Sequence, residues 1–186
     1  MNTPNKLTVA RVIITPFFLL AIMSSIPHRF LISCLIFSIA AITDAVDGKL
    51  ARKNNQVTTF GKLLDPVADK MLTTAALLAF IAEGICGVWP VFIILTREFI
   101  ITSVRLVAAS QNVVVAANIW GKIKTATQMV FTIIIMLWGE LVEVFGFLKL
   151  DFHFVTNIMI WITAVLALIS GVIYLVQARK TIDFSK

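Results

Sequence analysis

The chain alternates between long apolar runs and short polar connections. A helix needs about 20 apolar residues to cross the hydrocarbon core of a bilayer. Runs near this length predict six membrane-spanning helices, in residues 8–25, 30–47, 63–82, 88–109, 125–145 and 154–177. The polar segment 1–7 is predicted to lie at the membrane surface before the first span. Because the connections are short, the sequence predicts one all-α bundle over residues 1–186.

Composition supports this interpretation. Of the 186 residues, 59% are hydrophobic and only 14% are charged, which excludes an ordinary water-soluble domain. The net charge of +6 is compatible with nucleic-acid binding, but the basic residues gather at one rim of an apolar body. Anionic lipid head groups are the nearer partner for such a rim. The sequence therefore predicts a lipid bilayer as partner and no nucleic acid.

The basic residues also predict the orientation in the membrane, because Lys and Arg accumulate in cytoplasmic connections. Fourteen of the sixteen lie in or close to the termini and the even-numbered connections, whereas Arg29 and Lys149 fall on the opposite side. Both termini are therefore predicted to be cytoplasmic. Glu83, Glu140, Glu143 and Asp151 are assigned to the outer side, and the connection between the second and third spans to the cytoplasm.

Four of the ten acidic residues flank that connection: Asp44, Asp47, Asp65 and Asp69. A carboxylate at the edge of a bilayer is costly unless it meets a cation, a proton or water. Spacings of three and four residues place each pair on one face of a helix. Because the segment between the pairs is short, the two helices are predicted to run antiparallel, so that all four carboxylates share one cavity.

Four carboxylates in one cavity repel one another unless divalent cations neutralise them. Oxygen ligands without a nearby His or Cys favour Mg²⁺ or Mn²⁺ over zinc, and a pair of ions suits phosphoryl transfer. Gly48 and Gly61 remove side chains where a bulky ligand approaches the backbone, and Arg52 offers a forked phosphate donor. Alternatively, the aspartates only end a helix and pair with Lys62 and Lys70 on a solvated face.

The segment Asp44-x2-Asp47-Gly48-x2-Ala51-Arg52-x8-Gly61-x3-Asp65-x3-Asp69 resembles the signature of the CDP-alcohol phosphotransferases at all eight fixed positions. The resemblance implies a six-helix membrane fold, a homodimer, and two divalent cations held by the four aspartates, with Asp69 as the base. It also implies that a CDP-linked lipid binds against Gly48, Ala51, Arg52 and Gly61.

The N-terminal pattern Pro4-Asn5-x2-Thr8-x2-Arg11 is similar to the bacterial phosphatidylglycerophosphate synthases of that family. The resemblance implies that Asn5 and Thr8 line the cytidine pocket. Alternatively, these polar residues only cap and anchor the first helix. The resemblance further implies the cytoplasmic membrane of a bacterium, with the active site facing the cytoplasm.

Basic residues in the fourth and fifth spans indicate the acceptor. Arg97, Arg105, Lys122 and Lys124 are predicted to form a cationic pocket beside the metals, which suits an acceptor that carries a phosphate. Segments 97–109 and 121–129 also look like phosphatidylglycerophosphate synthases, which implies glycerol 3-phosphate. Alternatively, Glu98 neutralises Arg97, and the two lysines are interfacial anchors.

These residues lead to a hypothesis for the reaction. The 1-hydroxyl of glycerol 3-phosphate loses its proton to Asp69 and attacks the β-phosphorus of CDP-diacylglycerol, and CMP leaves. The same chemistry with inositol phosphate or serine is an alternative. A divalent-cation transporter is an alternative of another class, but it explains poorly why the acids lie at the rim, and the other half of the chain has no second aspartate cluster.

Overall fold

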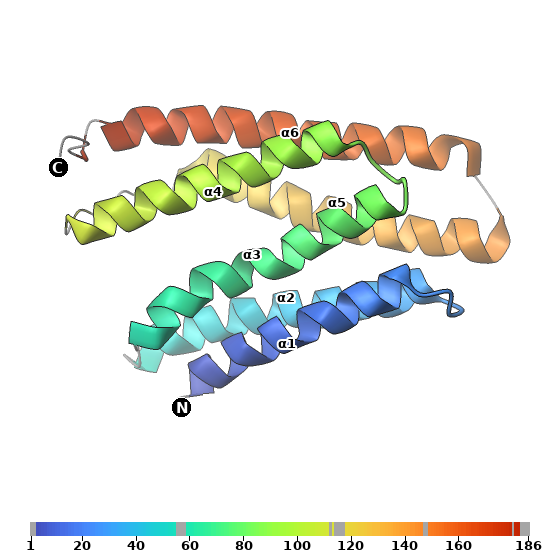
Figure 1. Ribbon diagram of the computed structural model, residues 1–186, viewed down its shortest axis with the longest axis horizontal. Coiled ribbons are helices and arrows are strands. Elements are labelled where there is room, and N and C mark those ends of the chain that lie inside the picture. The colour runs from blue at the N-terminus through green and yellow to red at the C-terminus, as the bar shows by residue number, and fades with distance from the viewer. Residues whose placement is uncertain are drawn as a thin grey trace. The chain divides into compact units, whose positions relative to one another are not determined.

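The structure is a computed structural model in which helices account for almost all of the described chain (Figure 1). It describes residues 3–54, 59–111, 113, 118–146, 149–179 and 181–182. Within these ranges only the backbone is described for residues 3–7, 44–54, 59–66, 69 and 149–151. The described residues form no strand and six helices, which are α1 (Thr3–Met23), α2 (Arg29–Asn54), α3 (Thr59–Ala82), α4 (Val88–Ser110), α5 (Ile119–Phe145) and α6 (Lys149–Arg179). The prediction of an all-α protein with six helices is confirmed.

The helices extend beyond several of the predicted spans. α1 begins at Thr3 and therefore includes most of the polar segment that precedes the first apolar run. Pro4 suits the first turn of a helix, because the N–H that proline lacks has no partner there. α2 continues to Asn54, past the end of its apolar run, so the helix itself carries the polar signature segment. Hydrophobicity thus located the helices but not their polar ends.

Two helical segments, Ile119–Phe145 and Phe152–Arg179, are long and apolar enough to cross a membrane by length and composition. The apolar stretches described in α1, α2 and α3 are shorter, and α4 carries three charged residues. Large apolar side chains are nevertheless exposed on several helices, among them Phe17 (59%), Phe99 (63%) and Val172 (61%). Such surfaces favour lipid over water. The structure therefore supports a membrane protein, whereas the number of spans and their orientation remain predictions.

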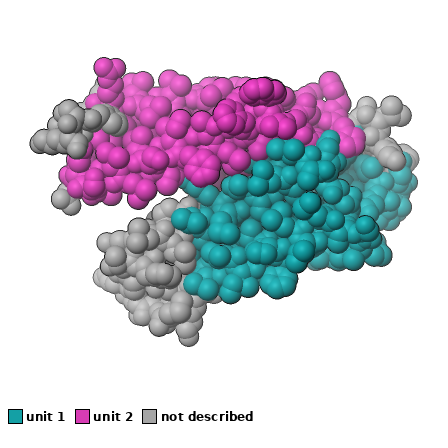
Figure 2. All heavy atoms as spheres, viewed as in Figure 1, with its two compact units in different colours: residues 1–84, 132–152 teal, residues 85–131, 153–186 magenta. Residues whose placement is uncertain are grey.

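The chain divides into two compact units (Figure 2). Unit 1 contains residues 1–84 and 132–152, and hence α1, α2, α3 and the last part of α5. Unit 2 contains residues 85–131 and 153–186, and hence α4, the first part of α5 and most of α6. The single catalytic domain expected over the whole chain remains a prediction.

In unit 1, α1 packs along both α2 and α3 (Figure 1). Phe18 of α1 and Phe37 of α2 are fully buried, and their ring centroids lie 6.0 Å apart. On α3 the buried positions include Ala75, Ala76 and Ala79. Small side chains such as these let helix backbones approach closely, which is how helices associate where no water drives them together.

An ionic network closes the end of unit 1 at which α2 begins. Arg29 Nη1 lies 2.8 Å from Glu83 Oε2, and its Nε donates to Glu143 Oε2 at 3.2 Å. Burial lowers the pKa of the Arg29 guanidinium, but the hydrogen bonds and charge interactions with Glu143 and Glu83 outweigh burial, so its pKa is raised overall. Arg29 therefore ties the start of α2 to the ends of α3 and α5.

Glu140 adds a second tie at the same end. Its Oε2 accepts a hydrogen bond from the backbone N–H of Leu31 at 3.0 Å, and its Oε1 lies 2.5 Å from Nδ1 of His28. The carboxylate thus satisfies a backbone donor in the first turn of α2, where a negative charge is favourable. Three of the acids assigned from the sequence to one side of the membrane, Glu83, Glu140 and Glu143, do gather in one place, whereas the side chain of Asp151 lies outside the described residues. The side of the membrane remains a prediction.

In unit 2, α4 and α6 run in the same direction (Figure 1). Just before α4, the backbone N–H of Gly87 donates to Asn157 Oδ1 at 3.2 Å, and Thr156 Oγ1 donates to the carbonyl of Ile85 at 3.1 Å. Near the other end of both helices, the guanidinium of Arg105 lies over the ring of Tyr174. These contacts fix the register between α4 and α6.

Candidate functional site

The four aspartates lie on two consecutive helices of unit 1. Asp44 and Asp47 belong to the second half of α2, and Asp65 and Asp69 to the first half of α3. Both pairs have helical backbone, so the spacing of three and four residues places each pair on one face of its helix. Their side chains lie outside the described residues, as do those of Ala51 and Arg52, and only the backbone of Gly48 and Gly61 is described. Their convergence in one cavity therefore remains a prediction.

The helix bounds add one observation on the aspartates. Asp44 lies ten residues before the last residue of α2, and Asp69 lies ten residues after the first residue of α3. Asp47 and Asp65 lie seven and six residues from the same two ends. At a rise of 1.5 Å per residue, these separations correspond to about 15 Å and about 10 Å along each helix. The two pairs thus lie at matching heights from the connected ends.

The N-terminal candidates lie on α1. Thr8 is 4% exposed and Arg11 is 5% exposed, whereas the side chain of Asn5 lies outside the described residues. Thr8 and Arg11 are three residues apart, so they occupy one face of the helix. One turn further on, Thr15 Oγ1 donates to the carbonyl of Arg11 at 2.9 Å. This polar face of α1 is buried rather than turned to lipid, as both a structural role and a ligand role require.

Two of the four basic candidates meet at one carboxylate in unit 2. Arg97 Nη1 donates to Glu98 Oε1 at 2.9 Å, and Lys124 Nζ contacts the same oxygen. The Lys124 side chain is only 2% exposed, and that of Arg97 is 11% exposed. Burying a cation is costly unless a counter-charge accompanies it, so Glu98 lets α4 and α5 carry these cations inside the protein.

Two glycines make room for the Arg97 side chain. A Cβ at Gly171 would lie 3.0 Å from Arg97 Cγ, and a Cβ at Gly121 would lie 3.4 Å from Arg97 Nη2. Arg97 therefore runs between α5 and α6 where both backbones lack a side chain. We did not predict this from the sequence, although an isolated glycine inside a helical pattern often marks a close approach.

Arg105 and Lys122 are placed differently from the Glu98 cluster. Both are exposed, Arg105 on α4 and Lys122 on α5. The guanidinium carbon of Arg105 lies 5.5 Å from the centroid of the buried Tyr174 ring on α6. The aspartates belong to unit 1 and the basic residues to unit 2, so the predicted adjacency of the two groups remains a prediction.

A pocket of about 290 Å³ lies between α4 and α6 beside Arg97. Its walls are mainly apolar side chains, including Phe92, Ile100, Leu168 and Val172. Thr96 and Arg97 also line the pocket, but its other walls cannot satisfy the many hydrogen bonds of a nucleotide. The pocket therefore suits an apolar group better than the polar parts of a CDP-linked substrate.

The chain is similar to known proteins in both sequence and fold. The family model described as CDP-alcohol phosphatidyltransferase matches residues 1–169. Among curated relatives, the CDP-diacylglycerol–glycerol-3-phosphate 3-phosphatidyltransferase of Bacillus subtilis is 38% identical, and the match covers 91% of each chain. The enzyme of the same name from Haemophilus influenzae is 37% identical, with 97% of this chain and 95% of that one covered.

A solved structure resembles the fold. Phosphatidylinositol phosphate synthase from Mycobacterium tuberculosis, in its apo form, matches with a TM-score of 0.61. The match covers 94% of this chain and 90% of that one, at 18% sequence identity. At this identity the likeness concerns the fold alone.

Proposed function

Because the chain belongs to the CDP-alcohol phosphatidyltransferase family, we propose that it transfers the phosphatidyl group of CDP-diacylglycerol to glycerol 3-phosphate, giving phosphatidylglycerophosphate and CMP. The observation that carries this proposal is the set of curated relatives named for that reaction, at 36% to 38% identity over most of both chains. The eight matched positions of the signature support the same chemistry.

The proposed metal site consists of Asp44, Asp47, Asp65 and Asp69, holding two divalent cations, Mg²⁺ or Mn²⁺. The matching heights of the two pairs on consecutive helices support a shared site. Carboxylate oxygens are the ligands that these hard cations prefer. When bound, the ions supply positive charge against the diphosphate and the leaving oxygen.

In the transfer step, the Asp69 carboxylate takes the proton of the 1-hydroxyl of glycerol 3-phosphate. The freed oxygen forms a bond to the β-phosphorus of CDP-diacylglycerol, the bond between that phosphorus and the bridging oxygen breaks, and CMP leaves with the electron pair. Gly48, Ala51 and Gly61 let the nucleotide approach the helix backbone, and Arg52 donates to a phosphate. Asn5 and Thr8 line the cytidine side, and Thr8 lies on the buried polar face of α1.

The acceptor phosphate is proposed to bind to Arg97, Arg105, Lys122 and Lys124. Arg105 and Lys122 are exposed and can reach a charged ligand. Arg97 and Lys124 are held by Glu98, which fixes the direction of both cations at the shared oxygen. A phosphate with two negative charges gains most from several cations that are already oriented.

The setting of the reaction is part of the proposal. The distribution of basic residues supports six spans with both termini in the cytoplasm, and the exposed apolar side chains support lipid contact. The active site would then face the cytoplasm, where CMP is released. We further propose a homodimer in a bacterial cytoplasmic membrane.

An acceptor panel tests the proposal. Purified protein in detergent is incubated with CDP-diacylglycerol, Mg²⁺ and one alcohol at a time: glycerol 3-phosphate, inositol phosphate or serine. We expect CMP release with glycerol 3-phosphate only. Release with another alcohol alone would overturn the acceptor assignment, and no release with any alcohol would favour the transporter hypothesis.

A further inference from the structure

The side chain of Arg105 is exposed on α4, so another group must restrict its position if it is to bind a phosphate well. A free arginine side chain loses rotamer entropy when a ligand fixes it. Here the guanidinium carbon lies 5.5 Å from the centroid of the Tyr174 ring, within the range of about 6 Å at which a cation and an aromatic face attract. The ring therefore restricts where the guanidinium lies before any ligand arrives.

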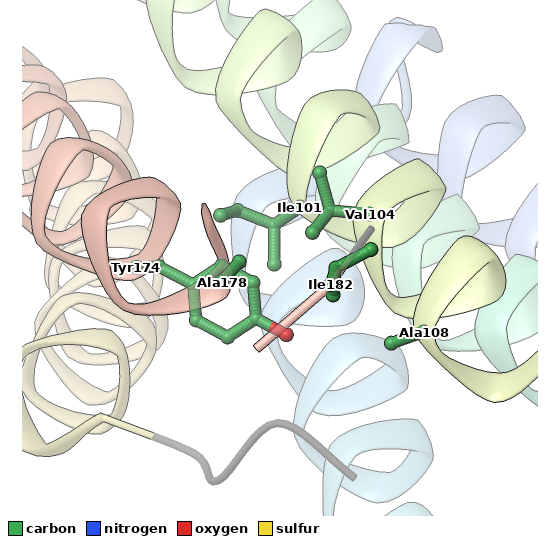
Figure 3. Close-up of a cluster of buried hydrophobic side chains, with 6 residues drawn as sticks. All are labelled: Ile101, Val104, Ala108, Tyr174, Ala178 and Ile182. Atoms are coloured by element: carbon green, nitrogen blue, oxygen red, sulfur yellow. The ribbon is translucent and has the colours of Figure 1, made fainter. Parts of the chain in front are cut away.

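The ring itself is held by a buried cluster of apolar side chains (Figure 3). Tyr174 is 2% exposed, and it packs with residues of α4, of α6 and of the segment that follows α6. The other members of the cluster are Ile101, Val104, Ala108, Ala178 and Ile182. Because protein interiors are close-packed, a ring enclosed in this way has a fixed orientation.

The C-terminal turn completes this enclosure. α6 ends at Arg179, and the backbone N–H groups of Thr181 and Ile182 both donate to the carbonyl of Ala178, at 3.0 Å and 2.9 Å. These hydrogen bonds turn the chain back, and Ile182 is left only 5% exposed within the cluster. Thr181, one residue earlier, is exposed.

The aromatic face, rather than the hydroxyl, is the part of Tyr174 that the fold uses. The hydroxyl oxygen is buried and has no hydrogen-bond partner in the described part of the chain. A buried hydroxyl without a partner lowers stability, so it is not what keeps a tyrosine at this place in the fold. The ring, in contrast, contacts both the cluster and Arg105.

We propose that Tyr174 is a positioning residue for the acceptor: its ring, enclosed by the C-terminal turn at Ile182, holds the Arg105 guanidinium where it binds the phosphate of glycerol 3-phosphate. This inference rests on the proposed function, which assigns Arg105 to that phosphate. Tyr174 acts through Arg105 and need not touch the substrate.

The first test compares Tyr174→Leu, which removes the ring, with the conservative Tyr174→Phe, which keeps it. Tyr174→Leu should raise KM for glycerol 3-phosphate about fivefold, in line with a partly desolvated cation–π contact. Its kcat and its KM for CDP-diacylglycerol should stay within about twofold, and Tyr174→Phe should restore KM for glycerol 3-phosphate to that same range. The proposal would be overturned if Tyr174→Leu and Tyr174→Phe raised KM for glycerol 3-phosphate equally. It would also be overturned if Tyr174→Leu changed KM for glycerol 3-phosphate and KM for CDP-diacylglycerol by the same factor.

The second test asks whether Tyr174 acts through Arg105. In an Arg105→Gln background, in which loss of the cation has already raised KM for glycerol 3-phosphate, Tyr174→Leu should change this KM by less than about twofold further. A full and additive loss in that background would show that the ring supports the fold generally, and would overturn the positioning role.

The third test concerns the C-terminal turn. Ile182→Ala should raise KM for glycerol 3-phosphate, and the matched control Thr181→Ala, at the exposed neighbour, should not. An unchanged KM in Ile182→Ala would remove the turn from the proposal. The wild-type acceptor panel is run first: absence of CMP with glycerol 3-phosphate refutes the proposed function, whereas normal wild-type turnover with unchanged variants refutes this inference alone.

Discussion

Glu98 offers the sharpest test of the packing in unit 2. It accepts from Arg97 Nη1 and contacts Lys124 Nζ through a single oxygen, and the Lys124 side chain is 2% exposed. Glu98→Gln keeps the size and an oxygen acceptor for Arg97 but removes the negative charge. Lys124 would then be a buried cation that has lost its carboxylate.

The size of this effect follows from the burial. Removing one partner of a buried ion pair costs about 3 to 5 kcal/mol, and because Glu98 is 21% exposed we expect the lower end, about 3 kcal/mol. For a chain of this length, 1 kcal/mol shifts Tm by about 2 to 4 °C, so Glu98→Gln should lower Tm by about 6 to 12 °C. The assay is thermal unfolding of purified protein in detergent, followed by tryptophan fluorescence.

A second substitution makes the reasoning refutable. If the loss arises from burying the Lys124 cation without the Glu98 carboxylate, then Lys124→Met in the Glu98→Gln background should recover at least half of the lost Tm, because the buried charge is gone. The control is Glu143→Gln. Because the Glu143 side chain is 39% exposed, this substitution should lower the free energy of unfolding by less than about 1 kcal/mol. A further decrease of Tm on adding Lys124→Met, or an equal decrease of Tm in Glu98→Gln and Glu143→Gln, would refute the reasoning.

Three further predictions concern other parts of the chain. Asp69→Asn should reduce CMP release by at least about a thousandfold with Tm unchanged within error, since the proposed base is lost, and retained turnover would remove Asp69 from that role. EDTA should abolish release and added Mg²⁺ or Mn²⁺ should restore it, whereas activity that survives chelation would contradict the metal site. Burial raises the pKa of the Cys86 thiol to about 11, so in a Cys34→Ser background its alkylation by iodoacetamide should be slow at pH 8 and rise with each pH unit up to pH 10; a plateau near pH 9 would show an ordinary thiol.

The lengths of the apolar runs were sufficient to predict the helices, because each apolar run must become a helix to satisfy its backbone inside a membrane. The apolar runs could not predict that α2 continues to Asn54, because the signature segment at the end of this helix is polar. The spacing of the aspartates, in contrast, could be interpreted from the sequence alone, because residues three or four positions apart lie on the same face of a helix.

The contacts of the basic residues could be predicted only in part. A charge inside a span should turn inward, and the structure does bury most of the Arg97 side chain against Glu98. The stacking of Arg105 on Tyr174 could not be foreseen, because it depends on the parallel register of α4 and α6 and on a turn after α6. Neither this register nor this turn can be predicted from the local sequence.

The close approach of Arg97 to the glycine at position 171 has a consequence for natural variation. A methyl group added at position 171 would press on Cγ of Arg97, and one added at position 121 would approach its Nη2. Drift at position 171 is therefore constrained for as long as the arginine stays. In lineages where a shorter residue has replaced Arg97, position 171 becomes free to accept alanine or serine, so the two sites should covary.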